Sequence, residues 1–228
     1  MITGYMQRME VIGKEILMRK VPSKYKYKAG VVLARMQPLH IAHMFLIAQA
    51  LIECEKVYVF LGSANKHGTK RNPLPSELRL SILRDAILNS GWSKSDTERI
   101  VGVYDLPDWS FENDSNKDAN WYWGQYLYFN VVSRTQTKEF AIYYSDGREQ
   151  IESWFTADHI KKFVHIRTFE RNDLFDGLSA TKVREAIVKG NDKYLFEFLP
   201  YNVVINLPMI RGHFEHAAKN PIRDSAMK

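Results

Sequence analysis

The sequence predicts an α/β fold in which a mostly parallel sheet carries helices on both faces. Short runs of β-branched and aromatic residues alternate with longer segments of helical periodicity along the chain. These runs are apolar almost throughout, as is typical of parallel strands that are buried on both faces. With 228 residues, 45% hydrophobic and 25% charged, the chain has the composition of one large globular domain. In such a fold, ligands bind outside the carboxyl ends of the strands.

The predicted strands are short apolar or β-branched runs that end at turn residues. The first is Ala29–Ala34, and the second, Lys56–Leu61, stops at Gly62. The other three are expected at Arg99–Tyr104, Phe140–Tyr144 and Lys162–Arg167.

The predicted helices repeat apolar residues every three or four positions. In Ser76–Asn89, the side chains of Leu78, Ile82, Leu83 and Ala86 fall on one side, as in an amphipathic helix. The Ser-Glu-Leu-Arg start of this segment predicts a capping box. The other helices are expected at Ile41–Glu53, near Ala119–Ser133, near Gly147–Ala157 and at Ser179–Lys189.

The chain divides into three parts by charge and pattern. Residues 1–28 form a basic N-terminal extension, residues 29–200 form the α/β domain, and residues 201–228 form a C-terminal extension expected to pack on that domain. The extension 1–28 carries seven basic and two acidic side chains and therefore holds most of the net charge of +6. Such a segment is either an arm for acidic partners or a solvated extension, and we favour the second, with no nucleic-acid partner.

The location of the protein is constrained by its cysteine content and its apolar runs. Cys54 is the single cysteine, which excludes an internal disulfide framework and fits a reducing compartment. No apolar run reaches the roughly 18 to 20 residues that a membrane span needs. The first residues, with Arg8 and Glu10, do not read as a secretory signal. We therefore expect a cytoplasmic protein with no membrane partner.

The segment Arg35–His43 is the first candidate for chemistry. It follows the first strand directly and places His40 and His43 three residues apart at the start of a helix. The N-terminus of a helix favours an anion, and imidazoles there can donate hydrogen bonds to phosphate oxygens. Such a pair, taken alone, also fits capping or packing. A zinc site fits less well, because Cys54 and the scattered histidines supply no companion ligands at an obvious spacing.

The segment Ser179–Arg184 is the second candidate. Its Ser and Thr residues open the last expected helix, and Arg184 follows one turn later. A capped helix start with a nearby guanidinium can bind a second anion, while an ordinary N-cap with a solvent-facing arginine is the simpler alternative.

Together these segments resemble the nucleotidyltransferase superfamily. Arg35–His43 is similar to the signature G-R-F-Q-P-x-H-x-G-H, and Ser179–Arg184 is similar to I-S-S/G-T-x-x-R. Between them, Gly62-Ser63-Ala64-Asn65, Asn72-Pro73, Glu77 and Arg79 resemble a block of the nicotinamide mononucleotide adenylyltransferases. The resemblance is to the archaeal type and to the adenylyltransferase half of bifunctional adenylyltransferase–Nudix enzymes, without a Nudix signature. Over residues 29–200 it implies a Rossmann-like doubly wound parallel sheet.

The resemblance implies transfer of AMP from ATP to nicotinamide mononucleotide, giving NAD and pyrophosphate. Such a transfer needs positioning and charge stabilisation rather than a protein nucleophile. Mg²⁺ is expected to be held mainly by the substrate phosphates, with no protein ligands. The implied catalytic residues are His40, His43 and Arg184. The implied ATP-binding residues are Arg35, Gln37, His40, His43, Gly62, Ser179, Thr181 and Arg184.

The acceptor is expected to bind to polar and aromatic side chains farther along the chain. The resemblance implies the acceptor-binding residues Asn72, Arg79, Asp108, Trp109 and Trp121. A nicotinamide ring stacks well on an indole, and Trp123 competes with Trp121 for that role. Alternatively, the aromatic residues 121–128 fill the core, and Asn65 and Asn72 cap turns. Residues 105–117 are too long for a plain connector and form a candidate substrate loop.

Two departures from the family pattern leave alternatives open. Ala34 and Ala42 stand where the family usually has glycine, and each adds a methyl group where nucleotide can approach backbone. The variant His-Ile-Ala-His also resembles a box of class I aminoacyl-tRNA synthetases, but no Lys-Met-Ser-Lys-Ser loop or anticodon domain is found. The remaining alternatives are another acceptor within the superfamily and a non-catalytic nucleotide sensor. The oligomeric state, monomer or homo-oligomer, also stays open.

Overall fold

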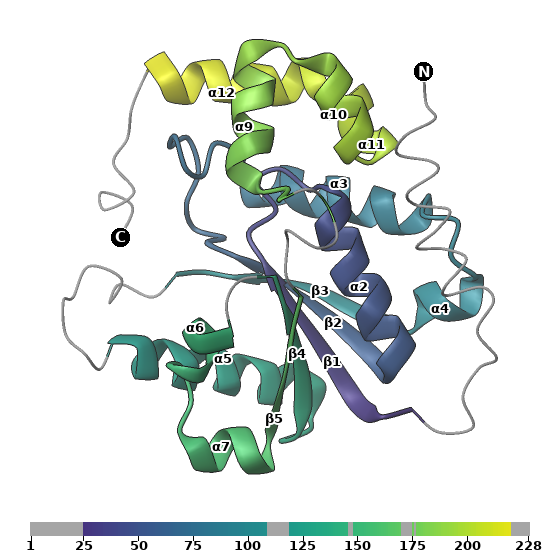
Figure 1. Cartoon of the computed structure of the whole chain (residues 1–228), viewed down its shortest axis with the longest axis vertical. Coiled ribbons are helices and arrows are strands. Elements are labelled where there is room, and N and C mark those ends of the chain that lie inside the picture. Colours follow the sequence, from purple (N-terminus) through teal and green to yellow (C-terminus); the bar gives the residue numbers. More distant parts are fainter. Residues whose placement is uncertain (1–24, 109–118, 146–147, 170–174, 176, 220–228) are drawn as a thin grey trace.

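The fold is a five-stranded, all-parallel sheet with the strand order β3-β2-β1-β4-β5 (Figure 1). The structure is a computed structural model, and it describes residues 25–108, 119–145, 148–169, 175 and 177–219. The strands are β1 (Tyr27–Ala34), β2 (Cys54–Gly62), β3 (Ile100–Leu106), β4 (Phe140–Tyr144) and β5 (Val164–Thr168). Every neighbouring pair is parallel, so the predicted Rossmann-like α/β architecture is confirmed.

The pleat of the sheet divides the core into two layers, one on each face. Along β1, Val32 packs into one buried cluster, whereas Val31 and Leu33 pack into the other. Successive side chains of a strand point to opposite faces, so a continuous apolar run can serve both layers. One face carries α2 (Ile41–Glu53), α3 (Ser76–Leu88) and α4 (Lys94–Glu98), and the other carries α5 (Ala119–Thr135), α6 (Arg148–Glu152) and α7 (Ala157–Lys162) (Figure 1).

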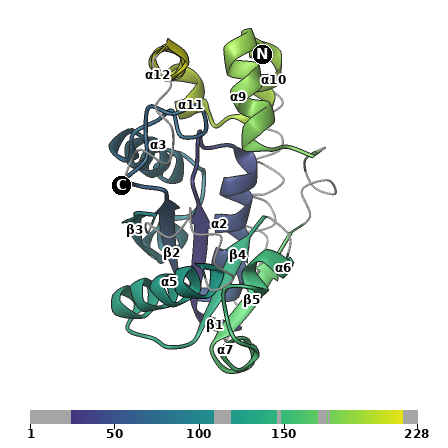
Figure 2. The ribbon, with the colours of Figure 1, turned by 90° about the vertical axis from the view of Figure 1, so that its left-hand side faces the viewer.

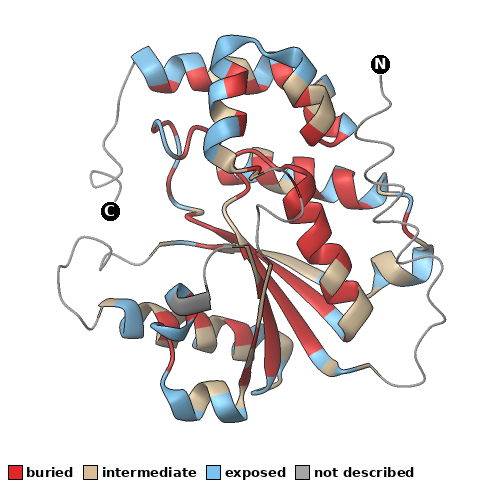
Figure 3. Ribbon diagram, in the orientation of Figure 1, coloured by how far each residue is buried: buried red, intermediate tan, exposed pale blue. Residues whose placement is uncertain are grey.

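Helix α2 is the central helix of the larger layer. Figure 3 shows it buried along nearly its whole length, in keeping with its almost continuous apolar sequence. It ends at Cys54, whose buried Sγ atom lies 3.3 Å from Oη of Tyr143. Gly30 faces this thiol, and a Cβ atom there would lie 2.7 Å from Sγ. Helix α2 therefore packs directly against the backbone of β1.

The burial of Cys54 also changes its chemistry. Burial raises the pKa of its thiol from 9.0 to about 12, although the hydrogen bond with Tyr143 acts in the opposite direction. On the other side, Oη of Tyr143 donates to the Glu53 carboxylate, which also pairs with the guanidinium of Arg167 at 2.6 Å. The thiol is therefore uncharged at neutral pH and belongs to the packing between α2 and β4.

Four helices form a cap beyond the carboxyl ends of the strands (Figures 1 and 2). They are α9 (Ala180–Lys189), α10 (Asp192–Phe198), α11 (Tyr201–Ile205) and α12 (Leu207–Lys219). Their buried residues Val203, Leu207 and Ile210 belong to the same core cluster as α2 and α3. Residues 201–219 thus add to the core of the α/β unit. No helix in the described part of the chain has both the length and the apolarity to span a membrane.

Three expectations about individual elements were wrong. The helix expected near Gly147–Ala157 is only five residues long as α6, because the chain turns after it and α7 starts at the N-cap Thr156, whose side chain accepts from the amide of His159. The strand expected from Lys162 begins at Val164, since α7 runs through Lys162. Ser76 is not an N-cap: Pro75 occupies that position without a side-chain cap, so the capping box predicted there is absent.

Candidate active site

The buried polar side chains gather where β1 and β2 end. Of the buried polar residues in the described ranges, all except Asn202 belong to residues 37–43 or 63–79. These two segments are the loop from β1 into α2 and the loop from β2 into α3, each with the first turn of the helix that follows. Burying polar groups costs free energy unless they are paired. Their concentration in these two segments therefore indicates a functional site rather than ordinary apolar packing.

His40 and His43 form a stacked pair at the start of α2. His40 is the N-cap residue, and its ring centroid lies 3.8 Å from that of His43, with 27° between the ring planes. The backbone N–H of His40 donates to Nδ1 of His43 at 3.2 Å. Since Nδ1 is the acceptor, the neutral ring of His43 carries its proton on Nε2, which is a hydrogen-bond donor. Capping and anion binding are therefore compatible in this pair.

Arg184 reaches from the cap to the start of α2. It lies on α9, and its Nη1 donates to the backbone carbonyl of Gln37 at 3.2 Å, while Nη2 donates to Oγ1 of Thr181 at 3.1 Å. Ser179 is the N-cap of α9, and its Oγ accepts from the amide of Lys182. The simple N-cap interpretation thus describes Ser179, but Arg184 turns inward and joins the two sequence motifs.

The charges around Arg184 are mostly positive. Burial lowers the pKa of its guanidinium, and the nearby charges of Arg35 and Arg71 lower it further, against a smaller opposing effect of Glu185. Clustered guanidinium groups repel one another, so an anion that binds among them relieves this repulsion. Arg71 was missed by the sequence reasoning. Its signal was its place directly before Asn72-Pro73 in the block that resembles the adenylyltransferases.

Gln37 connects the two loops, and Asn72 lies buried within the second. The side-chain amide of Gln37 donates to the carbonyl of Leu74 and accepts from its N–H, both at 2.9 Å. Asn72 is 2% exposed, and its backbone N–H donates to Oγ1 of Thr69. The side chain of Gln37, expected at substrate, thus binds backbone of the second loop, and Asn72 is buried within that loop.

Arg79 ties together the ends of the two central strands. Its side chain is 1% exposed and donates to the carbonyls of Arg35 at 2.7 Å, Gly62 at 3.0 Å and Ser63 at 3.1 Å. Burial lowers its pKa to about 10, although the charges of Asp105 and Asp108 act against this shift. Gly62 lies beside Arg35, since a Cβ atom on Gly62 would be 3.6 Å from Cγ of Arg35. Arg79 therefore contacts protein carbonyls through both Nη atoms.

Asp108 is placed at the start of the expected acceptor segment. Its carboxylate pairs with Nζ of Lys66 at 3.1 Å and accepts from the N–H of Ser63 at 3.2 Å. Trp109 and most of the candidate substrate loop lie outside the described residues. Of the expected pair Asp108 and Trp109, the structure therefore describes only Asp108.

The tryptophans on α5 differ in their surroundings. Trp121 is 42% exposed and meets only the edge of the Tyr122 ring among the ring contacts described, at 5.1 Å. Trp123 packs edge-on against Trp154, which belongs to the core layer of that face. The two interpretations of the aromatic segment thus apply to different residues: Trp123 packs against the core, and Trp121 keeps an accessible indole.

The donor atoms of the site are suited to phosphate rather than to a metal ion. Within the described ranges, no three His, Cys, Asp or Glu side chains are grouped so that they could hold a metal. Arginine and imidazole nitrogens bind phosphate oxygens, whereas Mg²⁺ prefers oxygen ligands. Of the two departures from the family pattern, Ala42 is 5% exposed and Ala34 is half-buried, and Ala42 belongs to the core cluster around α2.

Curated relatives of the chain carry adenylyltransferase names. A nicotinamide/nicotinic acid mononucleotide adenylyltransferase of Acinetobacter baylyi is 27% identical over 73% of this chain and 78% of the relative. A nicotinamide-nucleotide adenylyltransferase of Pyrococcus furiosus is 24% identical over 81% of this chain and 85% of the relative. These matches confirm the resemblance drawn from the motifs.

Solved structures share the fold. A bifunctional NMN adenylyltransferase/ADP ribose pyrophosphatase from Francisella tularensis superposes with a TM-score of 0.64 at 18% identity over 85% of this chain. The same protein complexed with AMP and a Mn ion gives a TM-score of 0.61 at 19% identity. The chain spans about half the length of these bifunctional proteins, since it covers 53% of them. The model of the cytidylyltransferase-like family matches residues 31–186, and the chain belongs to that family.

Proposed function

We propose that the protein is an adenylyltransferase that joins ATP and nicotinamide mononucleotide to give NAD and pyrophosphate. The observation that carries this proposal is the convergence of three side chains at one helix start. His40 and His43 stack at the N-terminus of α2, and Arg184 binds the Gln37 carbonyl of the same loop. The names of the curated relatives support the choice of ATP and of this acceptor.

The proposed reaction is an in-line transfer between phosphates. An oxygen of the acceptor's 5′-phosphate attacks the α-phosphorus of ATP and forms the new P–O bond. The bond from that phosphorus to the oxygen bridging the α- and β-phosphates breaks, and pyrophosphate leaves with its electron pair. No protein atom becomes covalently bound, so the protein acts by holding both phosphates in line and by stabilising charge.

The histidines and arginines divide this charge between them. Nε2–H of His43 donates to an oxygen of the reacting phosphates, with His40 stacked beside it. Arg35, Arg71 and Arg184 neutralise the β- and γ-phosphates that leave as pyrophosphate. A Mg²⁺ ion would be held mainly by the phosphate oxygens of ATP, where it would neutralise part of their charge. Thr181 contributes by orienting Arg184, to which its Oγ1 is hydrogen bonded.

The acceptor binds on the side of Asn72, Asp108 and Trp121. The indole of Trp121 is exposed and offers a face on which nicotinamide can stack. We place this reaction in the cytoplasm, where a lone buried thiol such as Cys54 stays reduced.

Pyrophosphate release from a matrix of substrates tests the proposal. The nucleotides are ATP and CTP, and the acceptors are nicotinamide mononucleotide, nicotinate mononucleotide, riboflavin phosphate and phosphopantetheine, all with Mg²⁺. We expect the highest kcat/KM for ATP with nicotinamide mononucleotide and formation of NAD in equal amount to pyrophosphate. Higher kcat/KM with another pair reassigns the substrate, whereas ATP binding without any pyrophosphate release identifies a sensor.

A further inference from the structure

One buried arginine lies where three neighbouring strands end. Arg79, on α3, is 1% exposed, and its Nη1 donates at 2.7 Å to the carbonyl of Arg35, which directly follows β1. Its Nη1 and Nη2 also donate to the carbonyls of Gly62 and Ser63 at the end of β2. The third strand, β3, contributes a charge: the carboxylate of Asp105 has the largest effect of the neighbouring charges on Arg79. A single guanidinium therefore connects β1, β2 and β3.

The pleat of β3 places Asp105 on the face of the sheet that α3 covers. Asp105 pairs in register with Leu61 of β2, beside Gly62. Val103, two residues earlier in β3, packs against the core cluster around α2 and α3. Because side chains two residues apart in a strand share a face, Asp105 points to the layer from which Arg79 reaches the strand ends.

The charges around Arg79 decide whether its guanidinium stays protonated. Burial lowers the pKa of Arg79 to about 10, and among the surrounding charges Asp105 opposes this shift most. Asp108 and Glu77 oppose it to a smaller extent, whereas Arg35 adds to it. A buried cation without a counter-charge is strongly destabilised. The charge of Asp105 therefore favours the protonated form that holds the three carbonyls.

The other two carboxylates are less suited to this role. Asp108 already pairs with Nζ of Lys66 at 3.1 Å, and Glu77 is exposed to solvent. Oδ1 of Asp105 and Nε of Arg79 are both buried, and neither atom forms a hydrogen bond within the described ranges. One is an acceptor and the other a donor, so the two side chains match in chemistry as well as in charge. Asp105 is thus the principal counter-ion of Arg79.

We propose that Asp105 and Arg79 are positioning residues, a counter-ion and a buried cation that together hold the start of the loop that binds the ATP phosphates. The inference rests on the proposed function, since it takes the loop from Arg35 to His43 as the ATP-binding loop. Arg79 fixes the carbonyl of Arg35, where this loop begins. It thus acts through Arg35 and is not the acceptor ligand that the family resemblance implies. Without the charge of Asp105, Arg79 loses its proton at lower pH, and a neutral guanidine binds carbonyl oxygens less strongly.

ATP binding measured as a function of pH tests this inference. Asp105→Asn removes the charge and keeps the shape of the side chain, and titration calorimetry with MgATP gives Kd from pH 7 to 9.5 for the full chain. We expect a Kd within about threefold of wild type at pH 7, and an alkaline weakening that begins about one pH unit lower than in wild type. Asp85→Asn, at an exposed acid on the same helix as Arg79, makes the same change of charge and is the matched control. It should leave the pH profile unchanged.

Steady-state kinetics separate the positioning of the ATP loop from a general loss of structure. We expect Asp105→Asn at pH 9 to raise KM for ATP several-fold, with KM for nicotinamide mononucleotide changed less than about twofold. Arg79→Lys keeps a cation but lacks the fork of donors that reaches three carbonyls, so it should raise KM for ATP about tenfold at pH 7. Circular dichroism at each pH defines the range over which each variant is folded.

The outcomes distinguish this inference from the proposed function. Wild type that binds ATP but makes no NAD overturns the proposed function and leaves the calorimetric test in force, whereas wild type that binds no ATP overturns both. An unchanged KM for ATP in folded Arg79→Lys protein, or equal rises of both KM values in Asp105→Asn protein, overturns the inference alone. If Asp105→Asn unfolds at high pH, the range where it is folded decides: its Kd relative to wild type must rise with pH, and a constant ratio contradicts the inference.

Discussion

The imidazole of His43 combines a structural bond with a catalytic assignment. Its Nδ1 accepts from the N–H of His40, which is one of the donors that a helix start leaves without an intrahelical partner. Its Nε2–H is the donor assigned to phosphate. The two nitrogens have different partners, so replacing the ring has two separate effects. Losing the Nδ1 acceptor lowers the free energy of unfolding, and losing the Nε2–H donor lowers kcat.

His43→Ala should therefore reduce kcat far more than it reduces stability. Loss of a donor that stabilises transition-state charge costs about 100- to 1,000-fold in kcat. Loss of the capping acceptor costs about 1 kcal/mol of the free energy of unfolding. Steady-state kinetics and urea denaturation measure the two effects, and His165→Ala, at a half-buried histidine paired with Glu139, is the control. A folded His43→Ala protein with near-normal kcat would remove His43 from the mechanism.

Ala42 is the clearest departure from the family pattern, and its surroundings predict which property it controls. The residue is 5% exposed and packs in the core cluster. Ala42→Gly removes a buried methyl group and loosens a helix start, so it should cost about 1 kcal/mol of stability. We expect no change in KM for ATP. A clearly lower KM for ATP in this variant would show that the methyl group crowds the nucleotide instead.

Side chains that bind their own helix were easier to predict than side chains that bind distant loops. The roles of Ser179 and the His40/His43 pair follow from short spacings at a helix start. The sequence gives no such signal for Arg79, whose partners are 16 to 44 residues away and come together only when two strands pair. Gln37, which binds Leu74 across 37 residues, is a second case.

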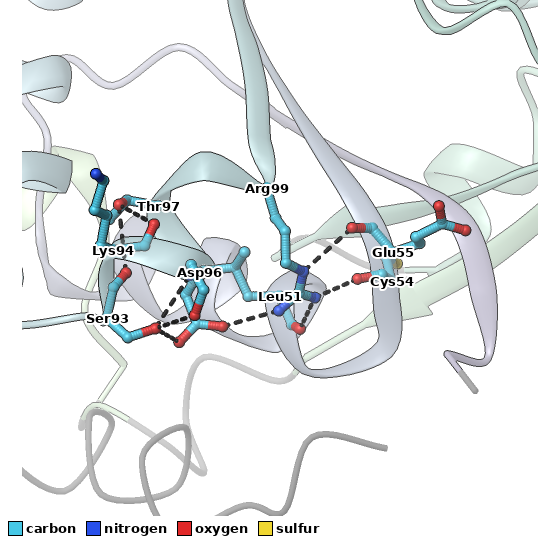
Figure 4. Close-up of polar contacts among 9 residues, drawn as sticks. Leu51, Cys54, Glu55, Ser93, Lys94, Asp96, Thr97 and Arg99 are labelled. Atoms are coloured by element: carbon cyan, nitrogen blue, oxygen red, sulfur yellow. Dashed lines mark hydrogen bonds and ion pairs between the residues drawn. The ribbon is translucent and has the colours of Figure 1, made fainter. Parts of the chain in front are cut away.

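Helix α2 is fixed at its far end by an arginine from the neighbouring strand region. Figure 4 shows Arg99, just before β3, reaching the carbonyls of Leu51, Cys54 and Glu55. Its Nη1 also pairs with Asp96 at 2.9 Å. A cation suits the C-terminus of a helix, where carbonyl groups lack intrahelical donors. Arg99 thus anchors the helix whose other end carries the histidines.

Arg99→Met should destabilise the fold without changing substrate affinity. Hydrogen bonds to charged groups contribute about 1.5–3 kcal/mol, and three carbonyls lose their donor here, so we expect a loss of about 3 kcal/mol in the free energy of unfolding. KM for both substrates should stay constant at temperatures where the variant is folded. Chemical denaturation measures the loss, with Lys162→Met at an exposed ion pair as the control. Equal stabilities of the two variants would show that α2 does not depend on Arg99.

Long periodic elements were predicted well, and short polar ones were not. Helix α2 has the bounds that were predicted, and β4 matches as well, because their apolar patterns are dense. Helix α4, Lys94–Glu98, was missed: it is polar throughout and is fixed by Ser93 and Arg99 rather than by burial. Helices α10 to α12 were also missed. Their apolar residues pack against α3 and α9, and such contacts between distant segments cannot be seen in the sequence.

The cap connects C-terminal helices to the proposed site near the start of α2. Helix α9 presents Arg184 to the loop before α2, while α12 packs on α9 and α11 packs on α3. Asn202 of α11 donates to the carbonyl of Ile82 in α3. The last described helices therefore hold the helix that bears a proposed catalytic guanidinium, although they bear none of the proposed site residues.

Deleting residues 201–228 should abolish ATP binding because the truncated protein does not fold. Each large aliphatic side chain buried there contributes about 1.5–3 kcal/mol, so losing Val203, Leu207 and Ile210 removes an amount comparable to the whole stability of a domain. We expect an insoluble or unfolded product by circular dichroism. Ile205→Ser, at a position 57% exposed on the same segment, should fold and turn over normally. A folded, ATP-binding truncation would show that α9 keeps its place without α11 and α12.

The single thiol, Cys54, is buried and can report how often the central helix α2 opens. Cys54 directly follows α2, and a reagent reaches it only when that helix separates from β1, where Gly30 leaves no room. The rate at which Cys54 is alkylated therefore reports the frequency of this local opening. A ligand that binds at the other end of α2 stabilises the closed state and lowers the alkylation rate. We expect MgATP to slow the modification, and His43→Ala to cancel this protection. The raised pKa adds a pH signature: the thiol's contribution to stability is complete below pH 9 and disappears as the pH rises towards 12.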